Sequence, residues 1–157
     1  MQRGRLVMIA RSNRHGWLAL LTLWGATLMP LPALAANCSV SSESLNFGQY
    51  DPFSSAPSDA ASTITVSCDA ETAFEIAVTP GAGSYAARTM THGDDVMAYN
   101  LYIDPQRTAV WGDGTGSTSA VSAIASRGDF TIYGRAPAGQ NLRPGLYTDT
   151  LSITVTY

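Results

Sequence analysis

The amino-acid sequence predicts an all-β protein built as an antiparallel β-sandwich. Apolar and polar residues alternate with period two in several short runs, which is typical of strands with one buried face. Segments rich in Gly, Pro, Ser and Asp separate these runs and are expected to form turns. Helical periodicity is essentially missing, so the crossover helices of a parallel sheet are not expected.

The first 35 residues predict a secretory signal peptide. Four arginines precede the apolar run "WLALLTLWGATLM", which leads into "PLPALA". The run is shorter than the roughly 20 apolar residues of a membrane-spanning helix, and Pro30 and Pro32 follow it at once. We therefore expect cleavage after Ala35, which leaves a single domain over residues 36–157.

The expected mature domain is acidic. It contains five arginines, no lysine and twelve acidic residues, a formal charge of −7. Such a field repels a phosphate backbone rather than neutralising it, so we expect no nucleic-acid partner.

The two cysteines of the chain, Cys38 and Cys68, predict a disulfide bond. An exported protein folds in an oxidising compartment, and a metal site would have only His92 to recruit beside them. A disulfide that closes a loop of this length contributes roughly 3 to 4 kcal/mol in the chain-entropy treatment. We expect no metal and no cofactor.

The first predicted strand ends at the second half-cystine of the expected disulfide, and the second predicted strand follows it. The run "TITVSC" over 63–68 ends at Cys68, with Ile64 and Val66 on the same face. The run "AFEIAV" over 73–78 places its apolar residues on one face, and the turn signal "PGAG" stops it.

Three further strands are predicted. The runs are "MAYNLYID" over 97–104, "FTIYG" over 130–134 and the final run over 148–157. The last run places four apolar residues on one face: Leu151, Ile153, Val155 and Tyr157. Periodicity alone does not distinguish the last strand of a complete sheet from an edge that awaits a partner.

The residue inventory offers few catalytic combinations. His92 is the only histidine of the expected mature domain, and both cysteines are expected to be oxidised. No G-x-S-x-G motif is present, and the adjacent Asp94 and Asp95 point to opposite faces of an extended chain. We expect no catalytic residues. A hydrolase that uses a carboxylate pair is an alternative that sequence spacing does not test.

The motif "WGDGTG" over 111–116 predicts a tight surface loop. A phosphate-binding loop needs a lysine, which the chain lacks, and an EF-hand loop needs several spaced carboxylates. Glycines that supply positive φ angles, with Trp111 packed beneath, account for the motif. A hairpin tip can also serve as a contact surface, so Trp111 and Asp113 are candidate surface-contact residues.

Several stretches resemble one known family. They are, in order, "NCSVSSESLNFGQYDP", "TITVSC", "YNLYID", "WGDGTG", "TIYGRAPAGQ" and "GLYTDTLSITVTY". Together they resemble the spore coat protein U domain, the subunit domain of archaic, Csu-type chaperone–usher pili. The resemblance covers nearly all of 37–157. It implies an incomplete immunoglobulin-like sandwich, which lacks one strand and is completed by a strand donated from another protein.

The resemblance also implies partners and a site. The partners are a periplasmic pilus chaperone, an outer-membrane usher and other pilus subunits, and the protein would pass through the periplasm to a surface fimbrium. The groove left by the missing strand would be lined by the terminal face named above: Leu151, Ile153, Val155 and Tyr157. Main-chain hydrogen bonds and alternate apolar side chains would bind the donated strand there.

The sequence departs from the family ahead of Cys38. Polymerising subunits carry an alternating apolar donor segment there, whereas cleavage after Ala35 leaves only Ala36 and Asn37. An earlier cut would free "TLMPLPALAAN", but its two prolines lack main-chain donors. This departure predicts an acceptor at the distal tip of a fibre. Tip adhesins of the family usually carry two domains, so a stand-alone secreted or coat protein remains an alternative.

The expected function is therefore a non-catalytic structural subunit of a surface fibre used in attachment and biofilm formation. The alternative from another class is a self-contained carbohydrate-binding module. Exposed aromatic rings of a β-sandwich can stack on sugars, and the residues to test are Trp111, Tyr85 and Tyr133. For either function, fibre subunit or carbohydrate-binding module, a surface or glycan receptor would be a partner.

Overall fold

The structure is a computed structural model that describes residues 36–157, and the predicted signal peptide lies outside the described residues. Within this range every secondary-structure element is a β-strand, and every pair of neighbouring strands is antiparallel. The prediction of an all-β, antiparallel protein is confirmed. No helix in the described part is long and apolar enough to cross a membrane. The strands are β1 (Cys38–Ser42), β2 (Ser58–Val78), β3 (Arg88–His92), β4 (Asp95–Tyr102), β5 (Val121–Ala136) and β6 (Ile153–Thr156).

The sheet is organised around the long strands β2 and β5. Its order is β1-β2-β5-β4-β3, and β6 also pairs with β2. β1 pairs with the first half of β2, from Cys38 opposite Cys68 onward, whereas β6 pairs with the second half, where Ile153 is opposite Val78. Both β1 and β6 therefore lie on the same side of β2, at different positions along it.

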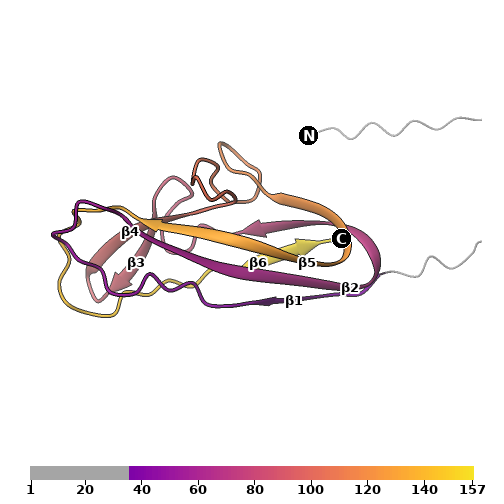
Figure 1. Cartoon of the computed structure of the whole chain (residues 1–157), viewed down its shortest axis with the longest axis horizontal. Coiled ribbons are helices and arrows are strands. Elements are labelled where there is room, and N and C mark those ends of the chain that lie inside the picture. The colour runs from indigo at the N-terminus through magenta and orange to yellow at the C-terminus, as the bar shows by residue number, and fades with distance from the viewer. Residues whose placement is uncertain (1–35) are drawn as a thin grey trace, which may run out of the picture. The chain divides into compact units, whose positions relative to one another are not determined.

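A corner in β2 and β5 gives the sheet its curl. Ser67 pairs with Arg127 and Thr72 with Ala125, so four residues of β2 stand opposite one residue of β5. Extra residues in one strand bend it and increase its twist. Figure 1 shows both strands turning back at this end, so that their two halves lie in two layers. The sequence predicted two separate strands here, and the structure joins them into one bent strand.

The core lies between these layers. It contains apolar side chains that each expose 7% of their surface or less, from β2, β4, β5 and the loop before β5: Ile64, Val66, Phe74, Ile76, Val78, Met97, Tyr99, Leu101, Trp111, Ile132 and Ala136. Their alternation along β2 and β4 is the period-two pattern of the sequence.

Several strand bounds differ from the predictions. β5 is much longer than the predicted 130–134, because its first half faces the core with the small residues Ala123 and Ala125 and leaves Ile124 exposed. β4 begins and ends two residues before the predicted 97–104, and the final strand is confined to Ile153–Thr156. Neither β1 nor β3 was predicted, because each contains one apolar residue besides the half-cystine of β1.

Candidate binding groove

Two segments of the described chain flank a gap in the curled sheet. We call residues 43–50, which follow β1, the N-terminal lip, and residues 142–152, which precede β6, the C-terminal lip. Neither lip belongs to a strand. In Figure 1 they run along the same side of the molecule, from the end opposite the β2–β5 corner toward β1 and β6.

The space between the lips is an apolar groove made of two adjoining hollows. One hollow of about 470 Å³ is lined by both lips and by floor residues from several strands: Val78, Met90, Tyr99, Leu101 and Ile132. The second, also of about 470 Å³, shares six lining residues with the first and adds Met97 to the floor. The shared residues are Leu45, Asn46, Phe47, Met90, Leu146 and Tyr147. Core residues therefore form the floor of a groove that is open to solvent.

Both lips alternate like strands although neither is paired as one. In the N-terminal lip Leu45 and Phe47 are half-buried, while their neighbours are exposed. In the C-terminal lip Tyr147, Asp149 and Leu151 are half-buried with exposed threonines between them. Period-two alternation is typical of extended chain with one face toward the core.

Much of the main chain of the lips is unpaired. Within residues 36–157, the main chain of 44–50 makes no hydrogen bond to another main-chain group. In the C-terminal lip, Thr148 exchanges two bonds with Thr91 at 2.9 and 3.1 Å, and the Ser152 carbonyl accepts from Thr79 N–H at 3.0 Å. Unpaired donors and acceptors in extended chain form a template for an added strand.

The N-terminal lip is held against the sheet at several points. The Ser62 hydroxyl donates to the Glu43 carbonyl at 2.7 Å, and the Tyr50 hydroxyl donates to the Pro137 carbonyl at 2.7 Å. Between these points Leu45 and Phe47 lie over Gly134 of β5, where a Cβ would lie 2.9 to 3.0 Å from their side chains. The missing side chain at Gly134 lets the lip approach the sheet.

Two of the four predicted groove residues line the groove, and the other two lie elsewhere. Leu151 and Ile153 line the groove. Val155 packs against the core and pairs with Ile76 of β2. Tyr157 is 58% exposed and lines a separate depression over the second half of β2 and the first half of β5, so it does not line the groove. The alternation therefore predicts which side chains of the last segment face inward up to Val155, but it does not predict that the groove ends at Ile153.

Most residues of the groove were missed by the sequence analysis. They come from the N-terminal lip, β3, β4 and the start of the C-terminal lip: Leu45, Phe47, Met90, Met97, Tyr99, Leu146 and Tyr147. The stretch "SLNFG" alternates over only two apolar residues, which is too short a signal to predict a strand.

The predicted disulfide is confirmed. Cys38 and Cys68 are bonded, with an S–S distance of 2.07 Å, and no free cysteine remains in the described chain. They are directly opposite each other in the β1–β2 ladder. The bond therefore fastens to β2 the strand that leads into the N-terminal lip.

The prediction that Trp111 is a surface-contact residue is wrong. Its side chain is 1% exposed, and its Nε1–H donates to the Ile76 carbonyl at 3.1 Å, because the indole fills the core beneath β2. Asp113 is exposed on the loop, where hydrogen bonds from the side chain and main chain of Thr115 lower the pKa of its carboxyl. The tight-loop interpretation of the motif, with the tryptophan beneath, therefore holds.

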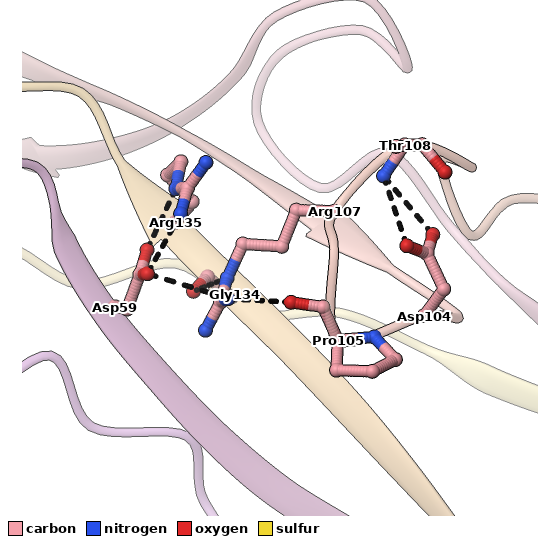
Figure 2. Close-up of polar contacts among 7 residues, drawn as sticks. All are labelled: Asp59, Asp104, Pro105, Arg107, Thr108, Gly134 and Arg135. Carbon is pink, nitrogen blue, oxygen red and sulfur yellow. Dashed lines mark hydrogen bonds and ion pairs between the residues drawn. The ribbon is translucent and has the colours of Figure 1, made fainter.

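The outer face of β2 and β5 carries an ion-pair cluster, shown in Figure 2. Asp59 accepts two hydrogen bonds from Arg135, at 2.7 and 2.8 Å, and lies 3.3 Å from Arg107. The hydrogen bond from Arg135 is the main reason that the pKa of Asp59 is lowered. Arg107 also donates to the Gly134 carbonyl at 3.2 Å, so the cluster fastens the loop after β4 to the sheet.

The aromatic residues considered for sugar stacking are partly covered. The Arg88 guanidinium lies 5.3 Å from the centre of the Tyr85 ring, and that of Arg107 lies 5.9 Å from the centre of the Tyr133 ring. Each arginine occupies one ring face. Among residues 36–157, no group of three His, Cys, Asp or Glu side chains is arranged to hold a metal ion.

The fold and the groove define the class: an antiparallel β protein with an apolar groove between two edge segments whose main chain is largely unpaired. A profile of the Spore Coat Protein U domain matches residues 25–154, and the chain therefore belongs to this family. The resemblance found in the sequence is confirmed. The chain is also 30% identical over 127 residues to Protein U of Myxococcus xanthus, an alignment that covers 72% of this chain and 71% of that protein.

A solved structure shares the fold. It is the chaperone–tip adhesion subunit pre-assembly complex CsuC–CsuE, from the archaic chaperone-usher Csu pili of Acinetobacter baumannii. The TM-score is 0.59 at 16% sequence identity, and the match covers 78% of this chain and 40% of the other. At this identity the likeness concerns the fold.

Proposed function

We propose that this protein is a non-catalytic, secreted structural subunit of an archaic chaperone–usher pilus, and that its groove accepts a strand donated by another protein. One observation carries the proposal: two lips with largely unpaired main chain flank a groove floored by core side chains. The fold shared with a subunit of a chaperone–subunit complex supports it.

The groove has the chemistry that strand addition requires. A strand laid between the lips pairs its main chain with 44–50 on one side and with the C-terminal lip on the other. Its alternate side chains enter the two hollows and cover partly exposed apolar side chains such as Met90 and Leu151. Each fully buried aliphatic side chain stabilises the complex by about 1.5 to 3 kcal/mol. A periplasmic chaperone occupies the groove first. At an outer-membrane usher, a strand of another subunit then replaces the chaperone.

Leu146 offers a test that leaves the fold intact. It lines both hollows but is 79% exposed, so Leu146→Asp puts a charge into the groove without burying it in the free domain. We expect the variant to lose co-purification with an archaic-type pilus chaperone, because a strand would bury the unpaired carboxylate.

The matched control is Ile124→Asp. Ile124 is 72% exposed and lies on β5, away from the groove. This variant should co-purify with the chaperone as the wild type does. Equal retention of both variants would contradict the groove as the binding site.

The domain boundaries and the position in the fibre are also proposals. Residues 1–35 are a signal peptide and 36–157 the mature domain, and the mass of the exported protein tests this boundary. The family match begins at residue 25, so an earlier cleavage would leave matched residues ahead of Cys38.

With cleavage after Ala35 the protein occupies the fibre tip and serves adhesion and biofilm formation. Antibody labelling along the fibre shaft would contradict the tip position.

A further inference from the structure

An acidic residue interrupts the apolar face of the C-terminal lip. The half-buried positions of this lip and of β6 are Leu142, Tyr147, Asp149, Leu151, Ile153 and Val155, and all but one are apolar or aromatic. Asp149 lines the groove among them. A carboxylate at an inward-facing position is costly unless it is hydrogen-bonded.

The Asp149 carboxylate has three hydrogen-bond donors. The Tyr99 hydroxyl donates to Oδ2 at 2.6 Å, and the main-chain N–H groups of Ala82 and Thr150 donate to Oδ1 at 3.1 and 2.8 Å. The carboxylate lies where a Cβ of Gly81 would be, so the glycine at that turn makes room for it. Asp149 thus fastens the C-terminal lip to the floor of the groove and to the turn after β2.

Tyr99 contacts both lips. Its side chain is 5% exposed on the floor of the groove, and its hydroxyl holds the C-terminal lip through Asp149. Its ring packs edge-on against Phe47 of the N-terminal lip, with 5.8 Å between the ring centres. Burial and the neighbouring carboxylate raise the pKa of Tyr99, so the hydroxyl keeps its proton and remains a donor.

We propose that Tyr99 and Asp149 are positioning residues that fix the spacing of the two lips before a strand arrives. One buried side chain bonds one lip and packs on the other, so its position sets the distance between them. A groove held at the width of a strand loses less conformational freedom on binding than one whose lips move independently. The inference rests on the proposed strand-accepting function and names the residues that prepare the groove for it.

The test uses the full chain, exported and processed by the cell, with Tyr99→Phe as the variant. This change keeps the ring and its contact with Phe47 but removes the hydroxyl. Tyr133→Phe makes the same change on the outer face of β5 and serves as the matched control. The probe is a capped, fluorescent peptide of alternating valine and threonine, and its affinity is measured by anisotropy.

We expect Tyr99→Phe to weaken peptide binding by up to roughly tenfold, because the lips are then no longer held at their spacing before binding and must be ordered at the expense of binding free energy. Hydrogen exchange of the amides of 146–151 should become faster in the free variant, while that of 63–67 should not change. Adding Asp149→Ala to Tyr99→Phe should weaken binding no further than Asp149→Ala alone, because the two residues act as one unit.

The outcomes separate the two proposals. If the peptide binds the wild type and Tyr99→Phe binds it as tightly as Tyr133→Phe does, the positioning role is wrong and the strand-accepting function stands. If the wild type does not bind the peptide, the strand-accepting function fails, and the inference fails with it. If Tyr99→Phe does not fold, the same comparison is made with Asp149→Asn, which keeps one acceptor for the hydroxyl.

Discussion

At the scale of single residues, a buried arginine joins β3 to β4 and to the loops that follow β2 and β4. Arg88 is fully buried and donates to the carbonyls of Thr79 and Trp111 and to the Asn100 side chain. A strand whose inward position holds an arginine has no apolar alternation, so the sequence does not predict β3. Such residues are recognised only once their hydrogen-bond partners are known.

Asp59 predicts a dependence of stability on acid pH. The hydrogen bond from Arg135 holds its pKa below the usual value of 3.8. A depressed carboxyl pKa contributes stability above the unfolded value, and the contribution is lost as the pH falls through the folded pKa. The free energy of unfolding should therefore decrease as the pH falls below about 4.

The Asp59 contribution is measured by urea unfolding of the wild type and of Asp59→Asn across this range. The carboxylate is about a third exposed, so we expect a difference of at most about 1 kcal/mol at neutral pH. The two curves should converge in acid. A gap that stays constant down to pH 2 would contradict the assignment.

At the scale of elements, the strongly alternating runs were predicted correctly as strands, and the corner was not. The runs "TITVSC" and "AFEIAV" each predict a strand, but the residues between them, Asp69 to Thr72, carry turn-like polarity. Only their place opposite β5 shows that they form a corner within one strand. Pairing partners are distant in the sequence, and a local pattern does not contain them.

The disulfide fastens β1, the element that leads into the N-terminal lip. We predict that replacing Cys38 and Cys68 by serine lowers the free energy of unfolding by about 3 to 4 kcal/mol, because the unfolded chain gains the freedom of the closed loop. Urea unfolding of the oxidised protein and of the double variant measures the difference. Reduced wild-type protein is the control and should match the variant, and an unchanged urea midpoint would refute the estimate.

At the scale of the whole molecule, the groove is a product of the curl of the sheet. Its lips are about 100 residues apart in the sequence and meet because β2 and β5 turn back at their corner. The terminal alternation predicted one lip, through Leu151 and Ile153. The floor and the N-terminal lip come from segments that no local pattern connects.

A strand that completes the curled sheet must pair with both lips. Hydrogen–deuterium exchange on the exported chain, with and without the alternating valine–threonine peptide, tests this pairing. We predict that the peptide protects main-chain amides in both 44–50 and 146–151, while those of 63–67, already paired within the sheet, do not change. Exchange at both lips that is unaffected by saturating peptide would contradict the claim.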